Sequence, residues 1–434
     1  MYTVGIYTLG CKVAQYESEA LSEEFEKRGL RLCDFSEECD AYVINTCTVT
    51  AESDRKSRQM IRRAIKKNPR AVIAVVGCYS ERSAEQILKI DGVSLVQGTD
   101  GKLSVAKRVL DILEGRSEGG IFKCPLGEAF EKMEISRAPR SRAYIKIEDG
   151  CESRCSYCAI RLARGRVRSK RPADVIREAE ALSESGVNEI VLTGIETGAY
   201  GKDFDTPYSL GELISELSRR GKVKRIRLGS LAPELVGREF CERVRDSKIL
   251  APHFHISMQS GSDNVLRGMK RKYNSKMAYE NIERLREAFP TAEFTTDMMV
   301  GFPGESEEDF KASLDFISRV GFLDVHVFAY SRREGTEAAK YDCQIDESLK
   351  GERSRIMIEH KNRVRDERLS RLVKEGRELS VIAETLLDGG GYSSHADNFA
   401  EIIFKPKSDA DLRGEFVKVI PVSHKDGIIY AEEI

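Results

Sequence analysis

Three cysteines lie within eight residues of one another, in the order Cys151-x3-Cys155-x2-Cys158. They follow a predicted strand at 143–149, so they occupy the loop at its C-terminal end, where parallel barrels keep their active sites. Three thiolates in so short a loop can hold a cubane iron–sulfur cluster by three irons, which leaves the fourth iron open to a substrate. Zinc is the first alternative, but a structural zinc site takes four ligands, and the nearest histidine, His253, is far along the chain.

Strands and helices alternate on both sides of this barrel triad, as we call Cys151, Cys155 and Cys158. Apolar runs at 3–9, 41–45 and 71–76, each followed by a helical pattern, predict a doubly wound parallel sheet. Six further strands with five intervening helices predict a partial (β/α)6 barrel, since eight strands would close a full one. These strands are expected at 143–149, 189–193, 224–229, 253–258, 293–300 and 323–329.

A long charged helix at 348–377 precedes short strands with turns at 389–391 and 426–427, which predict a small OB-like antiparallel barrel. The expected fold class is therefore α/β. The expected domains are 1–118 for the doubly wound sheet, 137–367 for the partial barrel and 370–434 for the C-terminal barrel.

A second set of cysteines shares one position in the predicted sheet. Cys11, Cys47 and Cys78, here called the N-terminal triad, each come directly after a predicted strand. Loops at the C-terminal ends of neighbouring strands converge on one crevice in a doubly wound sheet, so the three thiols could hold a second cluster. The alternative is that each is a small apolar residue packed at a strand end.

These motifs carry a family resemblance. The barrel triad before a partial barrel resembles the radical S-adenosylmethionine superfamily. The order of the N-terminal triad, the barrel triad and a small β domain is similar to the methylthiotransferases, over nearly the whole chain. The segments Thr8–Glu19, Val191–Ile195 and Gly198–Gly201 look like the MtaB type, which acts on threonylcarbamoyladenosine in tRNA.

The resemblance implies two [4Fe-4S] clusters and S-adenosylmethionine as cofactors. One S-adenosylmethionine would methylate a sulfur on the auxiliary cluster at the N-terminal triad. A second would yield the radical that activates carbon 2 of the adenine. Thr193 and Gly194 resemble the place where the superfamily contacts the amino group of S-adenosylmethionine, and three residues at other strand ends are further candidates for cofactor contact: Ser230, Gln259 and Ser260.

Two positions depart from the pattern of this type. Ala14 stands where asparagine is usual, and Arg161 stands where proline is usual. Both departures lie close in sequence to a cysteine triad, so they could change the surroundings of the clusters.

Local charge predicts contact with RNA, although the whole chain has a net charge of −1. Two basic runs without an acidic residue, 55–70 and 161–171, each follow a cysteine loop, which favours phosphate binding over a merely solvated face. The candidates are Arg62, Arg63, Lys66, Arg161, Arg164 and Arg166. The C-terminal domain resembles a TRAM domain but has an acidic excess, so its RNA contacts would be local: Lys405, Lys407 and Arg413, with Tyr392, Phe399 or Phe404 for stacking.

The remaining cysteines and the chain's context complete the expectations. No signal peptide or membrane-length apolar run is visible, so a cytoplasmic enzyme without a membrane partner is expected. A reducing compartment argues against disulfides, and the remaining cysteines are interpreted as packing or incidental thiols: Cys33, Cys39, Cys124, Cys241 and Cys343.

The expected partners are the tRNA anticodon stem-loop and a reducing system such as flavodoxin. Three alternatives stay open: methylthiolation of isopentenyladenosine in tRNA, methylthiolation of a ribosomal protein, and a non-catalytic iron–sulfur protein that binds RNA.

Overall fold

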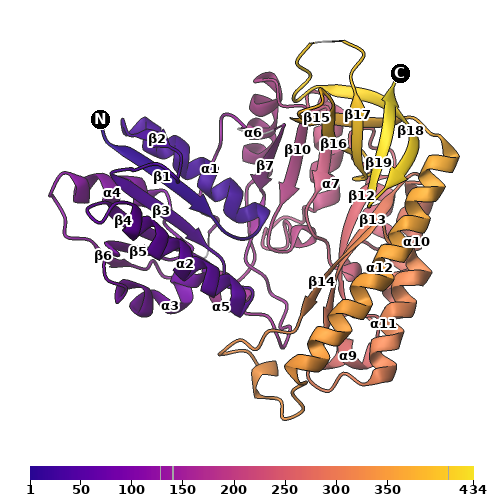
Figure 1. Cartoon of the computed structure of the whole chain (residues 1–434), viewed down its shortest axis with the longest axis horizontal. Helices are drawn as coiled ribbons and strands as arrows, with labels where there is room; N and C mark the ends of the chain where they lie inside the picture. Colours follow the sequence, from indigo (N-terminus) through magenta and orange to yellow (C-terminus); the bar gives the residue numbers. More distant parts are fainter. Residues whose placement is uncertain (128, 139–140, 409) are drawn as a thin grey trace.

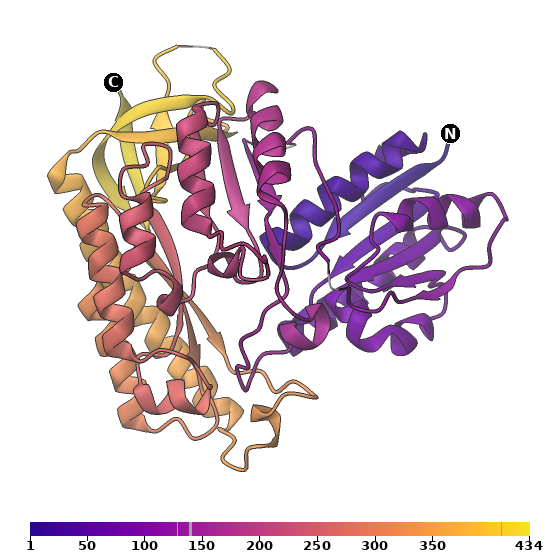
Figure 2. The same cartoon turned by 180° about the vertical axis from the view of Figure 1, so that it is seen from behind.

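The computed structural model describes residues 1–127, 129–138, 141–408 and 410–434. An N-terminal α/β domain lies beside a curved set of barrel strands, and a small C-terminal barrel covers one end of those strands (Figure 1). The view from behind shows the same three parts, with the long helix α12 (Glu347–Glu375) running along the outside of the barrel (Figure 2). The expected fold class is confirmed.

The N-terminal domain is built on a six-stranded parallel sheet in the order β2-β1-β3-β4-β5-β6. Its strands are β1 (Thr3–Thr8), β2 (Arg31–Cys33), β3 (Ala41–Thr46), β4 (Val72–Gly77), β5 (Leu95–Gln97) and β6 (Gly120–Phe122). Every residue of β3 and β4 is buried, because helices cover both faces of the sheet. These helices are α1 (Lys12–Lys27), α2 (Ala51–Lys67), α3 (Cys78–Leu88) and α4 (Ser104–Leu113).

The strand order reverses between β1 and β3, since β2 lies on one side of β1 and β3 to β6 lie on the other. Open α/β sheets bind ligands at such a reversal, in the crevice at the C-terminal ends of the strands. The N-terminal domain is predicted to end at residue 118, but the sheet continues beyond that position. Its last strand, β6, pairs with β5 through Gly120 to Phe122.

The central domain has the six predicted barrel strands in sequence order. They form two three-stranded parallel sheets, β7-β10-β11 and β12-β13-β14, joined by the bridges Ile226 to Leu250 and Leu231 to Ile256. The strands are β7 (Arg142–Lys146), β10 (Glu189–Thr193), β11 (Arg225–Leu228), β12 (His253–Gln259), β13 (Glu293–Val300) and β14 (Asp324–Ala329). The helices on the outside are α6 (Pro172–Glu184), α7 (Leu210–Arg220), α8 (Arg238–Val244), α10 (Ser275–Ala288) and α11 (Glu307–Val320).

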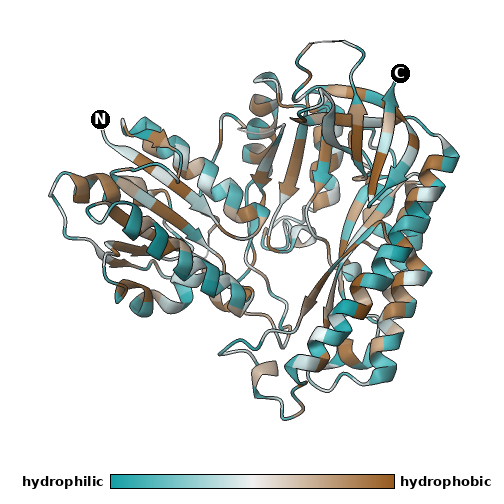
Figure 3. Cartoon of the chain, viewed as in Figure 1, coloured by the Kyte–Doolittle hydropathy of each residue, from teal (hydrophilic) through white to brown (hydrophobic). Residues whose placement is uncertain are grey.

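Side chains alternate between the two faces of these strands. Phe254 and Ile256 of β12 join the hydrophobic core beneath the outer helices. The residues that alternate with them, His253 and His255, therefore face the barrel interior. Figure 3 shows that the barrel strands are rich in hydrophobic residues, whereas α12 is largely hydrophilic. The barrel therefore presents an apolar outer face and a polar inner face.

Short elements around the cysteine loops could not be predicted from periodicity. They are β8 (Glu148–Asp149), β9 (Arg168–Ser169), α5 (Ile160–Arg164) and α9 (Asp263–Gly268). The first three surround the barrel triad: β8 precedes Cys151, and α5 and β9 follow Cys158. They are too short to show a repeating apolar pattern.

The C-terminal domain is a closed five-stranded barrel in the order β15-β16-β17-β19-β18. Its strands are β15 (Leu379–Leu386), β16 (Tyr392–Ala396), β17 (Glu401–Lys405), β18 (Phe416–Lys425) and β19 (Ile428–Glu433). Arg225 and Arg227 of β11 donate hydrogen bonds to the carbonyls of Ser380, Ala396 and Asp397. This barrel therefore covers the end of the central domain at which the strands begin, opposite the cysteine loop.

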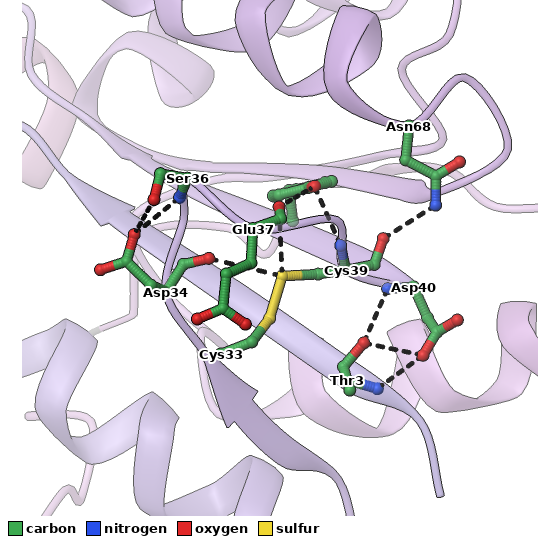
Figure 4. The surroundings of a disulfide bond; sticks show 9 residues. Thr3, Cys33, Asp34, Ser36, Glu37, Cys39, Asp40 and Asn68 are labelled. Atoms are coloured by element: carbon green, nitrogen blue, oxygen red, sulfur yellow. Dashed lines mark hydrogen bonds between the residues drawn. A yellow bond between two sulfur atoms is a disulfide. The ribbon is translucent and has the colours of Figure 1, made fainter.

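A disulfide joins Cys33 and Cys39, so the expectation of two incidental thiols is wrong (Figure 4). Cys33 ends β2, and Cys39 lies two residues before β3 begins. The loop between them turns back on itself, with Asp34 accepting hydrogen bonds from the backbone and hydroxyl of Ser36. Their Cα atoms come within 6.7 Å, inside the range a disulfide needs.

None of the helices in the described ranges is both long and apolar enough to cross a membrane.

Candidate functional site

The N-terminal triad meets at the reversal of strand order. Cys11 follows β1, Cys47 follows β3, and Cys78 begins α3 directly after β4. Gly10 has a φ of +111°, and a Cβ placed on it would lie 2.9 Å from the Cβ of Cys47, so only glycine permits this approach. Cys11 and Cys78 lie at the N-termini of α1 and α3, where the helix dipole favours a thiolate.

The barrel triad is held in its loop by the backbone on both sides. The amide of Cys151 donates to the carbonyl of Gly165, and the amide of Cys158 donates to that of Cys155. Gly150 before the loop has a φ of +83°, and a Cβ there would lie 1.8 Å from the carbonyl oxygen of Arg166. The amide of Ser153 donates to the Sγ of Cys151 at 3.4 Å.

Arg164 connects the two triads, and this corrects its prediction as an RNA contact. It lies on α5, just after Cys158, yet its Nε donates to the Sγ of Cys78 at 3.2 Å. Its guanidinium also pairs with Glu17 and Asp149, each at 2.9 Å, and its side chain is only 1% exposed. Arg164 is therefore unavailable to RNA, because two buried carboxylates compensate its charge.

The carboxylates around Arg164 belong to a larger buried network. Glu17 of α1 also pairs with Lys102 and, at 3.0 Å, with Lys146 of β7, which pairs in turn with Asp149 at 3.1 Å. Burial opposes the ionisation of Glu17, but the charges of Arg164, Lys102 and Lys146 outweigh it and hold its pKa well below its usual range. The network fixes the N-terminal domain against the barrel.

The barrel triad has an arginine of its own. The Nη1 of Arg271 donates to the Sγ of Cys155 at 3.3 Å, and its Nη2 donates to the carbonyl of Ser257 at 3.1 Å. Its Nε donates to the hydroxyl of Tyr273 at 2.9 Å. Sequence reasoning missed this residue, because it follows Cys155 by more than a hundred positions and no local motif marks it.

The spacing of the thiols does not match a single zinc ion. Zinc at about 2.3 Å from each sulfur places tetrahedral ligands roughly 3.8 Å apart. Among the described residues, neither triad has its three sulfurs all within 4.8 Å of one another. A cubane bonds each thiolate to a different iron and so spreads them more widely. Burial raises the pKa of the Cys47 and Cys151 thiols to about 11, so thiolates there need a positive partner such as iron.

Thr193 and Gly194 lie at the end of β10, against the carboxylate of Glu148. A Cβ on Gly194 would lie 2.4 Å from Oε2 of Glu148, and the same oxygen accepts from the amide of Glu196 at 2.9 Å. The other oxygen, Oε1, is buried and has no hydrogen-bond partner in the part of the chain that the structure describes. Thr193 and Gly194 therefore lie beside an unsatisfied acceptor that fits the ammonium of an amino acid.

The other candidates for cofactor contact are placed less uniformly. Ser230 is partly exposed two residues after the end of β11. Gln259 has a φ of +68°, which turns the chain at the end of β12. The hydroxyl of Ser260 is buried and lies 3.2 Å from that of Ser313, so its side chain is engaged within the fold.

Known protein families match both the N-terminal domain and the barrel domain. A family model described as the radical SAM superfamily matches residues 145–317, and one described as the uncharacterized protein family UPF0004 matches residues 3–98. Threonylcarbamoyladenosine tRNA methylthiotransferase MtaB from Bacillus subtilis is 39% identical, with 96% of this chain and 93% of that protein aligned. The chain belongs to the radical S-adenosylmethionine methylthiotransferase family.

Two further relatives represent different branches of the methylthiotransferase family. MtaB from Thermotoga maritima is 37% identical over 92% of this chain and 91% of its own. The tRNA-2-methylthio-N(6)-dimethylallyladenosine synthase of Thermoanaerobacter pseudethanolicus is 32% identical over 87% and 81%. The radical S-adenosylmethionine methyltransferase TsrM from Kitasatospora setae has a TM-score of 0.57 at 18% identity, covering 78% of this chain and 74% of its own, which shows a shared fold.

The inner wall of this methylthiotransferase's barrel carries a polar cluster. His255 and His326 each lie 3.1 Å from a carboxylate oxygen of Asp297, and Thr295 holds the other ring nitrogen of His255 at 2.9 Å. Burial opposes the ionisation of Asp297, but the two imidazoles hold its pKa below its usual range. These residue types could hold a cation, yet both oxygens already face an imidazole, so we assign no ion there.

The predicted RNA contacts divide according to exposure. Arg62, Arg63 and Lys66 are exposed on α2, Arg166 is exposed, and Arg161 is partly exposed, so these five remain candidates. The predicted stacking residues of the C-terminal domain are wrong. Tyr392 and Phe404 are buried in its core, and Phe399 stacks on His253 with ring centroids 4.4 Å apart.

The two departures from the family pattern have defined surroundings. Ala14 is buried in α1, and its carbonyl accepts a hydrogen bond from the side chain of Asn45 at 2.9 Å. This contact links α1 to β3 and does not depend on the side chain at position 14. Arg161 lies in α5, three residues before Arg164.

Proposed function

We propose that this methylthiotransferase transfers a methylthio group to carbon 2 of N6-threonylcarbamoyladenosine, next to the tRNA anticodon. The proposal is carried by the 39% identity to the B. subtilis protein named for that substrate, over 96% of the chain. The relative named for dimethylallyladenosine is 32% identical. An inert aromatic C–H bond requires radical chemistry, which the cofactors provide while the protein positions them.

The residues present fit two clusters and S-adenosylmethionine. Cys11, Cys47 and Cys78 would hold the auxiliary [4Fe-4S] cluster, and Cys151, Cys155 and Cys158 would hold the cluster that binds S-adenosylmethionine. When bound, these groups supply the sulfur that becomes methylated and the radical that activates carbon 2. Each triad would supply three thiolates to a four-iron cluster, and Oε1 of Glu148, which has no partner among the described residues, would offer an acceptor for the cofactor's ammonium.

The protein's own residues would orient these groups and limit access of water. Arg164 and Arg271 each donate to one cysteine sulfur, which stabilises negative charge on the thiolates. The buried network of Glu17, Lys146 and Asp149 holds the two triads on facing domains. The exposed basic face of α2 would contact tRNA phosphates, and a reduced flavodoxin or a similar cytoplasmic donor would supply electrons.

In the test, anaerobically reconstituted enzyme is incubated with each of three substrates. Two are anticodon stem-loops that carry threonylcarbamoyladenosine or isopentenyladenosine, and the third is the ribosomal protein named above as an alternative substrate. Nucleoside and peptide mass spectrometry would detect the methylthio group. We expect modification of the threonylcarbamoyl RNA. Preferential modification of either other substrate would overturn the proposed base, and no S-adenosylmethionine cleavage on reduction would favour a non-catalytic iron–sulfur protein.

A further inference from the structure

The position of the substrate's arm is constrained by the chemistry of adenine. Carbon 2 and carbon 6 flank ring nitrogen N1, and the exocyclic N6 is bonded to carbon 6. The threonylcarbamoyl arm on N6 therefore extends from the edge of the base beside the carbon that receives the methylthio group. If carbon 2 faces the auxiliary cluster, the arm passes close to the N-terminal triad, and its carboxylate needs a cation there.

Lys12 follows Cys11 and is the first residue of α1. Cys11 is the N-cap residue of this helix and its side chain makes no capping hydrogen bond, so the positive end of α1 acts on the Cys11 thiol as well as on the region around Lys12. Lys12 is partly exposed. Burial and the positive charges of Arg227 of β11 and Arg142 of β7 lower its pKa to about 8, whereas Glu189 and Asp297 on the same barrel wall oppose this shift. Its ammonium therefore faces the barrel from the edge of the N-terminal triad.

The acidic groups within electrostatic reach of Lys12 are already engaged. Glu189 pairs with Arg142, Arg225 and Arg227, and Asp297 is held by His255 and His326. Lys12 itself forms no side-chain hydrogen bond or ion pair with any residue in the described ranges, and only longer-range charges act on it. A cation that is partly buried, unpaired and beside an uncapped helix N-terminus is suited to an anionic group that the protein does not provide.

The arginines near the barrel triad that were predicted as RNA contacts are placed differently. Arg164 is compensated by two carboxylates, and Arg161 and Arg166 follow the barrel triad rather than the N-terminal one. We propose that Lys12 binds the carboxylate of the substrate's threonylcarbamoyl arm and so selects this base over one with an apolar arm. This inference rests on the proposed function, and it names the residue that determines specificity.

The test compares two stem-loops that differ only in the arm: the free carboxylate and its methyl ester. Binding to reconstituted holoenzyme is measured by fluorescence anisotropy, and kcat and KM are measured by mass spectrometry. The natural enzyme should favour the free carboxylate by about 10- to 100-fold, which is the range of a charge-assisted hydrogen bond. Lys12→Gln should remove that preference while leaving the ester unaffected, and Lys12→Arg should restore part of it.

Lys27→Gln is the matched control, because Lys27 lies exposed at the opposite end of the same helix. The second possible source of a carboxylate is the methionine part of S-adenosylmethionine. Reductive cleavage of S-adenosylmethionine without RNA distinguishes the two, and it should be the same in Lys12→Gln and the natural enzyme.

Three outcomes bear on the inference in different ways. A Lys12→Gln enzyme that still prefers the free carboxylate would overturn it, as would one that loses cofactor cleavage without RNA. A natural enzyme that modifies neither threonylcarbamoyl stem-loop would instead contradict the proposed function. Iron content, measured for every variant, should remain unchanged, because Lys12 supplies no thiolate.

Discussion

The two cysteine triads provide the same number of thiols by opposite routes. The barrel triad comes from one loop of eight residues, whereas the N-terminal triad comes from the ends of three strands, β1, β3 and β4. The first depends on a local turn held by Gly150 and the second on the sheet as a whole. A sequence therefore shows the first site as a motif, but it shows the second only when the order of strands is known.

The arginines that contact the triads differ in the same way. Arg164 reaches the N-terminal triad from the barrel domain and is paired with two carboxylates. Arg271 reaches the barrel triad from within the same domain and packs on Tyr273, with its guanidinium 4.9 Å from the ring centroid. The first contact crosses between domains, whereas the second does not, so the auxiliary site depends directly on how the domains are docked.

The largest expected effect comes from removing either triad. Replacing Cys151, Cys155 and Cys158 by alanine should halve the iron of the reconstituted enzyme from about eight atoms and abolish cleavage of S-adenosylmethionine. Replacing Cys11, Cys47 and Cys78 should also halve the iron but leave cleavage intact. Iron analysis and quantification of 5′-deoxyadenosine measure the two results.

Cys124, Cys241 and Cys343 provide the control, since alanine at these free cysteines should leave iron and cleavage unchanged. Zinc in the purified protein, or a single cluster in the natural enzyme, would contradict the assignment of two sites. Loss of cleavage in both triple variants would show that the triads do not act separately.

Periodicity and strand order predicted most of the fold. The apolar runs at β3 and β4 are continuous because both faces of the sheet are covered, and the resulting strand ends correctly located both triads. The contacts of charged groups could not be predicted, because Arg164 meets Glu17 across 147 positions and Arg271 meets Cys155 across 116. Composition likewise suggested that Arg164 was exposed, since a basic run looks the same whether its partners are solvent or buried carboxylates.

The disulfide shows a similar limit. The prediction that Cys33 and Cys39 are free thiols follows from the general scarcity of disulfides in reducing compartments. That rule concerns the compartment and does not say whether two cysteines six positions apart lie close enough to bond. The pairing of β1 with both β2 and β3 is what brings the two ends of that loop together. This pairing depends on tertiary structure and has no local signal.

An intermediate effect is expected from replacing each arginine by methionine. Arg164→Met should shift only the auxiliary cluster to a more negative reduction potential, because a hydrogen bond to sulfur stabilises the reduced form. It should also destabilise the protein by about 3–5 kcal/mol, since Glu17 and Asp149 lose a buried partner. Arg271→Met should shift only the other cluster, with a smaller cost of about 1–3 kcal/mol.

Redox titration followed by electron paramagnetic resonance separates the two clusters, and denaturant unfolding measures stability. Arg164→Lys keeps the charge and should recover part of both losses. Equal shifts of both clusters in either variant would contradict a separate role for each arginine. A shift in stability without a shift in potential would make Arg164 a purely structural residue.

The smallest expected effect concerns the basic runs that follow the two triads. The run after Cys47 is exposed on α2, whereas the run after Cys158 is partly internal, since Arg164, Arg168 and Lys170 are buried. Charge reversal of Arg62, Arg63 and Lys66 to glutamate should therefore weaken tRNA binding and reduce the slope of log affinity against log salt by roughly one for each lost phosphate contact.

Glutamate at Lys27, Lys107 and Lys248 makes the same change in net charge on other exposed parts of the chain and should alter the slope much less. Filter binding across a series of salt concentrations measures both variants. Equal slopes would mean that α2 is a solvated face and that net charge alone governs the affinity. A decrease confined to the α2 variant would place tRNA phosphates along the exposed face of α2, the helix that follows Cys47.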